Sequence, residues 1–289
     1  MALDLADPDA VTATFVRAAE AARCAACRDK SIDRIHPPGS IIATGDLHDN
    51  PMHLDRLIEA ARLQTDQPRH LVLHEIIHSD RLINGMDFSY RALAKVAALK
   101  AAHPEHVHVL LANHELAQLV NAGIVKEGIR VVEAFNAGVE YAFGAEAPRI
   151  GEAIGTFIRA MPLALRCECP TGDILIAHSL PSPWMMARFD PSILTRDLTD
   201  ADYESRAGSA YLMVWGRNYD ADQIEDLVER WHAAMFILGH EHVENGVKFI
   251  PPAAIVLNSD HARGVYLPFD LSRPPRAEQA MEFVVPLAQ

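Results

Sequence analysis

Short apolar runs bounded by turn residues alternate with amphipathic segments along this chain. Five of the apolar runs predict buried strands, at 40–44, 70–74, 107–111, 173–177 and 234–238. Between the earlier runs, the spacing of apolar residues predicts a helix that opens at Pro51 and further helices at 88–102 and 114–122. Because strands and helices alternate, the pattern favours an α/β architecture.

The segments outside this alternation complete the predicted domain organisation. A helical segment occupies residues 1–39, a core domain follows over 40–270, and a tail covers 271–289. Two stretches, 126–160 and 184–232, are mostly helical or irregular in pattern and contain no core motif. We interpret both as insertions over the site, and the second as the better candidate for a substrate cap.

Composition narrows the class of protein. With 289 residues, 49% hydrophobic content and a mean hydropathy near zero, the chain suffices for one large core. The formal charge of −13, without a run of Lys or Arg, argues against a nucleic-acid partner. No apolar run reaches 18 residues, so no segment is predicted to span a membrane.

Cysteine usage and the first residues bear on the compartment. The four cysteines form two close pairs, Cys24 with Cys27 and Cys167 with Cys169. We favour unpaired thiols in a reducing compartment over a four-cysteine zinc site, because the two pairs are far apart in the chain and the second is tightly spaced. Residues 1–9 carry no cationic region before an apolar core, so a secretory signal is not expected. We therefore predict a cytoplasmic protein.

Metal-binding residue types recur where the predicted strands end. The segments are Gly45-Asp46-Leu47-His48, Glu75, Asn113-His114-Glu115, His178 and Gly239-His240-Glu241-His242. Strand ends are where α/β folds place ligands and catalytic groups. A single histidine is more often a hydrogen-bonded residue than a ligand, but the joint order and spacing argue against chance. In an extended loop, residues two apart point to opposite sides, so His240 and His242 suit two adjacent metals.

In these motifs and their order, residues 40 to about 270 resemble the calcineurin-like metallophosphoesterases, closest to the branch of protein phosphatases and bacterial dinucleotide tetraphosphatases. The resemblance implies a four-layer αββα sandwich of two mixed sheets, with a dinuclear metal site at the strand ends. It implies one cation held by Asp46, His48 and His242, a second held by Asn113, His178 and His240, and a bridge between them at Glu75. It also implies that His114 donates a proton to the leaving group and that a hydroxide on the metals is the nucleophile. Ligands of these types suit Mn, Fe, Zn or Ni about equally, so the identity of the two divalent cations stays open.

The second motif departs from the family pattern Gly-Asp-x-x-Asp. Glu75 stands for the bridging aspartate, and His78 stands for the second aspartate, which in the family orients the catalytic histidine. We expect His78 either to bond His114 or to ligate metal. The arginines that grip phosphate in protein phosphatases are missing as well, since Leu111 stands where one is expected.

Three further residues are candidates for binding substrate. Asn50, beside the first motif, is a candidate to orient it. Arg217 and Arg263 are candidate substitutes for the missing arginines, and Arg217 is also a candidate catalytic residue.

The sequence thus predicts a metal-dependent phosphomonoesterase that acts on a phosphorylated small molecule or a phosphoprotein. Hydrolysis of dinucleotide polyphosphates or of phosphodiesters stays open, as does a catalytically weak metal-binding scaffold. Residues 74–78 also spell His-Glu-x-x-His, the zinc-protease signature, which requires a helix. The strand predicted at 70–74 argues against a protease.

Overall fold

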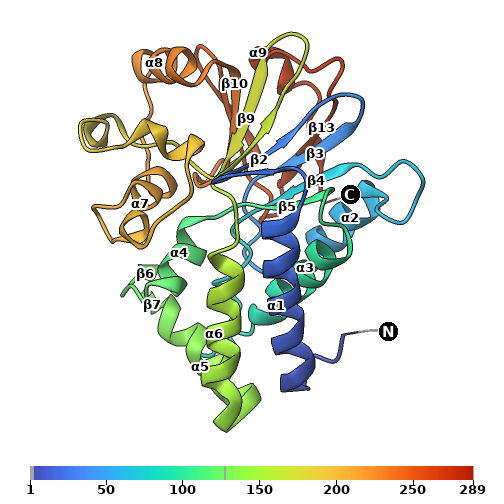
Figure 1. The fold of residues 1–289 in the computed structure, drawn as a ribbon, viewed down its shortest axis with the longest axis vertical. Coiled ribbons are helices and arrows are strands. Elements are labelled where there is room, and N and C mark those ends of the chain that lie inside the picture. Colours follow the sequence, from blue (N-terminus) through green and yellow to red (C-terminus); the bar gives the residue numbers. More distant parts are fainter. Residues whose placement is uncertain (1–2, 127, 289) are drawn as a thin grey trace.

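Two mixed β-sheets form the centre of the molecule, and helices cover them (Figure 1). The computed structural model describes residues 3–126 and 128–288. The larger sheet has seven strands, in the order β1 (Arg28–Asp29), β2 (Ile32–Ile35), β8 (Ala164–Cys167), β9 (Asp173–Ala177), β10 (Ala233–Leu238), β12 (Ala254–Leu257) and β11 (Val247–Ile250). The smaller sheet has five, in the order β14 (Val285–Pro286), β13 (Val265–Asp270), β3 (Ser40–Thr44), β4 (His70–Leu73) and β5 (Val107–Val109).

A closed apolar core lies between the two sheets. Ile41 and Val72 of the smaller sheet share one buried cluster with Ile176 and Ile237 of the larger sheet. The pairs β3–β4 and β4–β5 are parallel, as are β9–β10 and β10–β12. Parallel strands covered on both faces are continuously apolar, which explains why these strands appear in the sequence as unbroken apolar runs.

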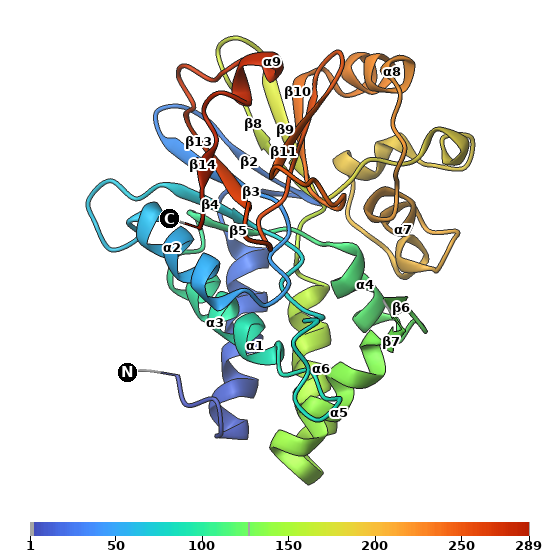
Figure 2. The ribbon, with the colours of Figure 1, turned by 180° about the vertical axis from the view of Figure 1, so that it is seen from behind.

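Helices form the outer layers (Figure 2). On the side of the smaller sheet, α2 (Pro51–Ala61) contacts β3 and β4, and α3 (Tyr90–Ala102) contacts β5. On the side of the larger sheet, α8 (Ala221–Trp231) contacts β10. The order helix, sheet, sheet, helix confirms the predicted α/β sandwich. The other α-helices are α1 (Pro8–Cys24), α4 (Asn113–Leu119), α5 (Val131–Phe143), α6 (Ala147–Ile158), α7 (Ser209–Val214) and α9 (Ala277–Ala280).

The two ends of the chain are built into the sheets. β2 pairs in parallel with β8, so residues 1–39 supply strands as well as the predicted helix. β14 pairs with β13, so the tail at 271–289 supplies an edge strand. β2 and β14 were not predicted from the sequence. In the described residues, no helix is long and apolar enough to cross a membrane.

The two predicted insertions differ in their relation to the site. In the first, α5 contacts α6 and α6 contacts α1, so both helices extend the helical layer. Among the described residues of this insertion, Lys126 lines the cleft described below; it belongs to β6 (Val125–Lys126), which pairs with β7 (Ile129–Arg130). The second insertion borders the same cleft through Trp215 and Arg217, which follow α7.

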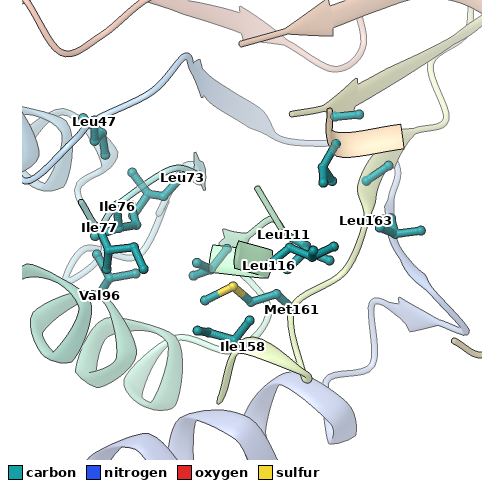
Figure 3. Packing of buried hydrophobic residues seen from close by; sticks show 14 of the residues in the cluster. Leu47, Leu73, Ile76, Ile77, Val96, Leu111, Leu116, Ile158, Met161 and Leu163 are labelled. Atoms are coloured by element: carbon teal, nitrogen blue, oxygen red, sulfur yellow. The ribbon is translucent and has the colours of Figure 1, made fainter. Parts of the chain in front are cut away.

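Buried apolar residues anchor the loops that carry the motifs. Leu47 lies between Asp46 and His48, and Ile76 follows Glu75 directly. Figure 3 shows these two apolar residues in one cluster with Leu73, Ile77 and Val96, and a neighbouring group formed by Leu111, Leu116, Ile158, Met161 and Leu163. Because these side chains are close-packed, the polar residues between them have fixed positions.

Candidate metal centre

The strand ends of both sheets meet at one cleft of about 520 Å³. The loops after β3, β4 and β5 bring Asp46, Glu75 and Asn113 from the smaller sheet. The ends of β9 and β10 bring His178 and His240 from the larger sheet. Because the strands within each of these sets are parallel, their carboxyl ends lie at the same edge, where α/β proteins bind ligands.

A first group of donor atoms converges at the inner end of the cleft. Asn113 Oδ1 lies 2.6 Å from His178 Nε2 and 2.9 Å from His240 Nδ1. Glu75 Oε2 lies 3.0 Å from His178 Nε2, and the two facing imidazole nitrogens are 3.1 Å apart. All four side chains are buried, and His240 Nε2 has no hydrogen-bond partner among the described residues. Imidazole, amide and carboxylate atoms at such short range suit a divalent cation.

Glu75 also faces a second group of donors. Its Oε1 lies 3.0 Å from His48 Nε2 and 3.7 Å from His114 Nε2. Asp46, at the same edge, accepts a hydrogen bond from the backbone N–H of His240 at 2.9 Å. One oxygen of Glu75 therefore faces each of the two groups of donors. The residues fit two divalent cations with the carboxylate of Glu75 between them.

His74, which replaces the glycine of the second motif, lies behind the donors. Its Nε2 is 2.8 Å from the carbonyl oxygen of Thr44, and its Nδ1 is 2.9 Å from His178 Nδ1. The ring is fully buried and thereby fixes the orientation of His178. No role was predicted for His74 from the sequence, although the histidine in place of the family's glycine was the available signal.

His242 lies apart from the other predicted ligands. Its side chain is exposed and lines the rim of the cleft, and its ring lies 5.0 Å from that of His261. The donor groups within the described residues bring together the other six predicted ligands but not His242. A ligand role for His242 stays a prediction.

Two predicted substrate contacts have other partners. Asn50 caps α2 by accepting from the backbone N–H of His53 at 3.1 Å, and its amide donates to the carbonyl of Asp260 at 2.9 Å. Arg263 binds Glu244 and Asn245 at 3.2 and 3.0 Å. Neither residue is among those that line the cleft, and a contact of either with substrate stays a prediction.

Two cationic residues do line the cleft. Arg217 lies exposed on its wall, and its role in binding substrate stays a prediction. Lys126, which the sequence analysis did not single out, comes from β6, and its Nζ lies 3.2 Å from His48 Nε2. A lone lysine between a valine and a glutamate gives no motif, so only the fold reveals its proximity to the donors.

Of the two roles expected for His78, the structure shows the contact with His114. Its Nδ1 lies 2.8 Å from His114 Nδ1, and its Nε2 lies 3.1 Å from Gln118 Oε1. The other nitrogen of His114 faces Glu75 and the cleft. His78 thus occupies the place of the family's second aspartate, but as a neutral partner in place of a carboxylate.

Strained backbone concentrates in the same loops. His48, Glu75, His78 and His240 have φ values of 41°, 50°, 62° and 71°. A left-handed conformation costs a residue other than glycine about 1–2 kcal/mol. Strain of this kind persists where the surrounding structure enforces it and clusters at functional sites.

Burial and mutual repulsion decide which carboxylate is charged. Burial and the neighbouring Glu75 raise the pKa of Asp46 to about 7. Burial acts in the same sense on Glu75, but the imidazoles of His114, His178 and His48 hold the pKa of Glu75 well below its usual range. Burial lowers the pKa of His114 well below its usual value. Crowded carboxylates that oppose each other's ionisation favour the binding of cations between them.

The conformation of residues 74–78 argues against a zinc protease. Residues 74–78 leave the end of β4 as an irregular loop, with left-handed Glu75 and His78. The two histidines point to different partners, His74 to His178 and His78 to His114. They therefore do not share a metal as two histidines on one helical turn would.

The four cysteines are free thiols, as favoured from the sequence. Cys27, Asp33 and His108 lie close enough together to hold a metal ion. Asp33, however, already accepts from His108 Nδ1 at 2.8 Å and from Arg28 Nε at 2.7 Å. Because its charge is balanced by Arg28, this group is a structural ion-pair network.

Comparison with known proteins agrees with the arrangement of fold and donors. A family model described as calcineurin-like phosphoesterase matches residues 39–244. No curated protein matches the sequence.

Solved structures of two phosphatases are similar to this chain. One is a protein serine/threonine phosphatase from Saccharomyces cerevisiae with similarity to human phosphatase PP5, at a TM-score of 0.68 and 15% identity, covering 98% of this chain and 94% of that chain. The other is a cold-active protein-tyrosine phosphatase of a psychrophilic Shewanella species, at a TM-score of 0.56 and 13% identity, covering 82% of this chain and 77% of that chain. At these identities the likeness concerns the fold.

Proposed function

We propose that this chain, which belongs to the calcineurin-like phosphoesterase family and is a hydrolase acting on phosphoester bonds, is a phosphomonoesterase that works with two divalent cations. The observation that carries the proposal is the position of Glu75, which lies 3.0 Å from His48 through one oxygen and 3.0 Å from His178 through the other. A carboxylate between two donor groups supports a pair of cations, of Mn, Fe, Zn or Ni. The ligands would be Asp46, His48 and His242 on one side and Asn113, His178 and His240 on the other.

Bound divalent cations would supply charge neutralisation for the phosphoryl group and a lowered pKa for a water molecule. The protein's own proton donor would be His114, whose Nε2 faces the cleft while its Nδ1 contacts His78. As the bond from phosphorus to the leaving oxygen breaks, that oxygen takes the bonding electrons and the proton from His114 Nε2. The attacking water loses a proton to solvent and His114 Nε2 takes one back from solvent, so the net products are phosphate and an alcohol.

Lys126 and Arg217 would take the place of the family's missing arginines. Both line the cleft, and they come from different insertions. Lys126 Nζ, at 3.2 Å from His48 Nε2, is within reach of a phosphate oxygen bound beside that donor. The Arg217 guanidinium can bind phosphate through two parallel hydrogen bonds.

The cleft favours a substrate with a single phosphate. Asp80 and Asp260 also line it, and their negative charge opposes additional phosphates at the rim. The two structurally similar proteins are named as serine/threonine and tyrosine phosphatases, which supports monoesters as the substrate class. A phosphorylated small molecule or a phosphoprotein is the substrate that we propose.

The test compares turnover of p-nitrophenyl phosphate with that of its bis-ester. Metal-free protein is reconstituted with Mn²⁺, Zn²⁺ or Ni²⁺, and bound metal is counted per chain. Metal-dependent turnover that prefers the monoester supports the proposal. Preference for the bis-ester would make the protein a diesterase, and two bound metals without turnover of either ester would make it a scaffold.

A further inference from the structure

A chain of hydrogen bonds leads from His114 away from the cleft to the surface of α5. His114 Nδ1 lies 2.8 Å from His78 Nδ1, and His78 Nε2 lies 3.1 Å from Gln118 Oε1. Gln118 Nε2 then donates to Asn136 Oδ1 at 2.7 Å. Gln118 is half-buried on α4 and Asn136 is exposed on α5. We call Asn136, Gln118 and His78 the positioning chain.

The direction of each hydrogen bond in the positioning chain follows from the atoms that face one another in the structure. Asn136 Oδ1 can only accept, so the amide nitrogen of Gln118 faces it and the amide oxygen faces His78. That oxygen also can only accept, so His78 carries its proton on Nε2. Both partners of buried His78 are uncharged groups, so the ring is neutral and its Nδ1 presents a lone pair to His114.

The hydrogen bond to His78 thereby fixes the orientation of the His114 ring. Its Nδ1–H donates to His78 whether Nε2 is protonated or free, so the ring keeps its orientation while Nε2 takes up a proton and delivers it. The edge of the His78 ring also packs against Phe135, at 5.8 Å between ring centroids, and the backbone N–H of His78 donates to Ser89 at 3.1 Å. These contacts hold His78 in place but do not decide which of its nitrogens carries the proton.

We propose that Gln118, oriented by Asn136, is a positioning residue for proton donation: it fixes the proton on Nε2 of His78 and thereby keeps Nε2 of His114 available to the leaving group. The inference deepens the proposed function and rests on it, because it assigns the proton donor's orientation to residues outside the family motifs. The role of the missing aspartate thus falls to an amide on α4, four residues after His114 on the same helix.

The leaving group provides a test that a purely structural role would not satisfy. Phenyl phosphate must have its leaving oxygen protonated, whereas 2,4-dinitrophenyl phosphate releases a stable anion. Gln118→Met removes the amide while keeping the length of the side chain. We expect it to lower kcat for phenyl phosphate by about 10- to 100-fold, to leave kcat for 2,4-dinitrophenyl phosphate nearly unchanged, and to leave KM for both unchanged.

Matched variants distinguish a role of Gln118 in orienting the proton from a role in packing alone. Gln118→Glu keeps an acceptor toward His78 and should retain the wild-type ratio of the two kcat values. Asn136→Ala, on the surface, should lower the same ratio by a smaller factor without risk to the fold. Gln64→Met is the control, since Gln64 also bonds a histidine, His103 at 2.9 Å, but after α2 and outside the cleft; it should change neither rate.

The outcomes distinguish this inference from the proposed function. If the wild-type protein hydrolyses neither ester with any metal, the proposed function fails. If the wild type hydrolyses both esters and Gln118→Met lowers both kcat values equally, or neither, the positioning role is overturned while the proposed function stands. A parallel loss of bound metal in Gln118→Met would also overturn it, because the effect would then be structural.

Discussion

Replacing Gly239 with alanine tests how closely the two sheets meet at the site. A Cβ at this position would lie 2.3 Å from Asp46 Oδ1 and 2.4 Å from His74 Cε1, whereas ordinary contact begins at 3.4 Å. The neighbours must therefore retreat by about 1 Å. Asp46 is held by the backbone N–H of His240 and His74 by the carbonyl of Thr44, so neither moves freely.

The size of that displacement sets the expected losses of stability and turnover. Forcing an extra methyl group into a close-packed region costs about 1–3 kcal/mol of unfolding free energy. A displacement of about 1 Å in a catalytic group can lower turnover by about 10²-fold. We expect Gly239→Ala to bind less metal and to lose at least this factor in kcat with p-nitrophenyl phosphate, measured together with chemical denaturation.

Gly151→Ala is the matched control. Gly151 lies within α6, and a Cβ there meets no atom within 4 Å. Alanine in a helix is favoured over glycine by about 0.5–1 kcal/mol, so this variant should be slightly more stable and fully active. Full metal content and wild-type turnover in Gly239→Ala would refute the argument that Gly239 is needed for the fit of β10 against Asp46.

Three further predictions concern charge. Glu75→Gln should lower metal occupancy at both positions, because its two oxygens face both donor groups; two tightly held metals per chain would contradict the bridge. Lys126→Ala should raise KM for p-nitrophenyl phosphate about tenfold, since a charged hydrogen bond contributes about 1.5–3 kcal/mol, and steady-state kinetics with unchanged KM would exclude the contact. Asp33→Asn should lower the unfolding free energy at pH 7 by about 3–5 kcal/mol, because Arg28 loses its partner. Although burial favours the neutral acid, His108 and Arg28 hold the pKa of Asp33 well below its usual range. The difference in unfolding free energy between the wild type and Asp33→Asn, measured by urea unfolding, should therefore be full above about pH 4 and shrink as the pH falls below it. A difference that stays constant with pH would argue against the ion pair.

The fold was predictable where strands are apolar on both faces. The run at 40–44 forms β3 within the predicted bounds, and Pro51 opens α2. β2 was not predicted because its four residues include Asp33 and Arg34, which interrupt the apolar pattern. Asp33 is buried because His108, distant in sequence, donates to it, and such a pairing exists only in the folded chain.

The site was predictable to the extent that chemistry is local in sequence. Asp46 and Glu75 stand at strand ends, and the sequence alone identified these positions. The choice between the two expected roles of His78 required the structure, because the distance to His114 depends on how the loop after β4 meets α4. Lys126 and Gln118 carry no motif, and the contacts of Lys126 with His48 and of Gln118 with His78 arise from tertiary packing.

The distribution of the donors along the chain bears on how the protein would acquire metal. The donors lie between positions 46 and 240, and strands of both sheets carry them. Bringing such distant segments together costs loop-closure entropy before any contact is gained, so we expect the centre to form late in folding. Fragments and partly folded chains would then lack the centre, and metal ions would not nucleate the fold. Ions that bind only the completed chain would stabilise it by mass action, so metal supply would set how long a finished molecule persists.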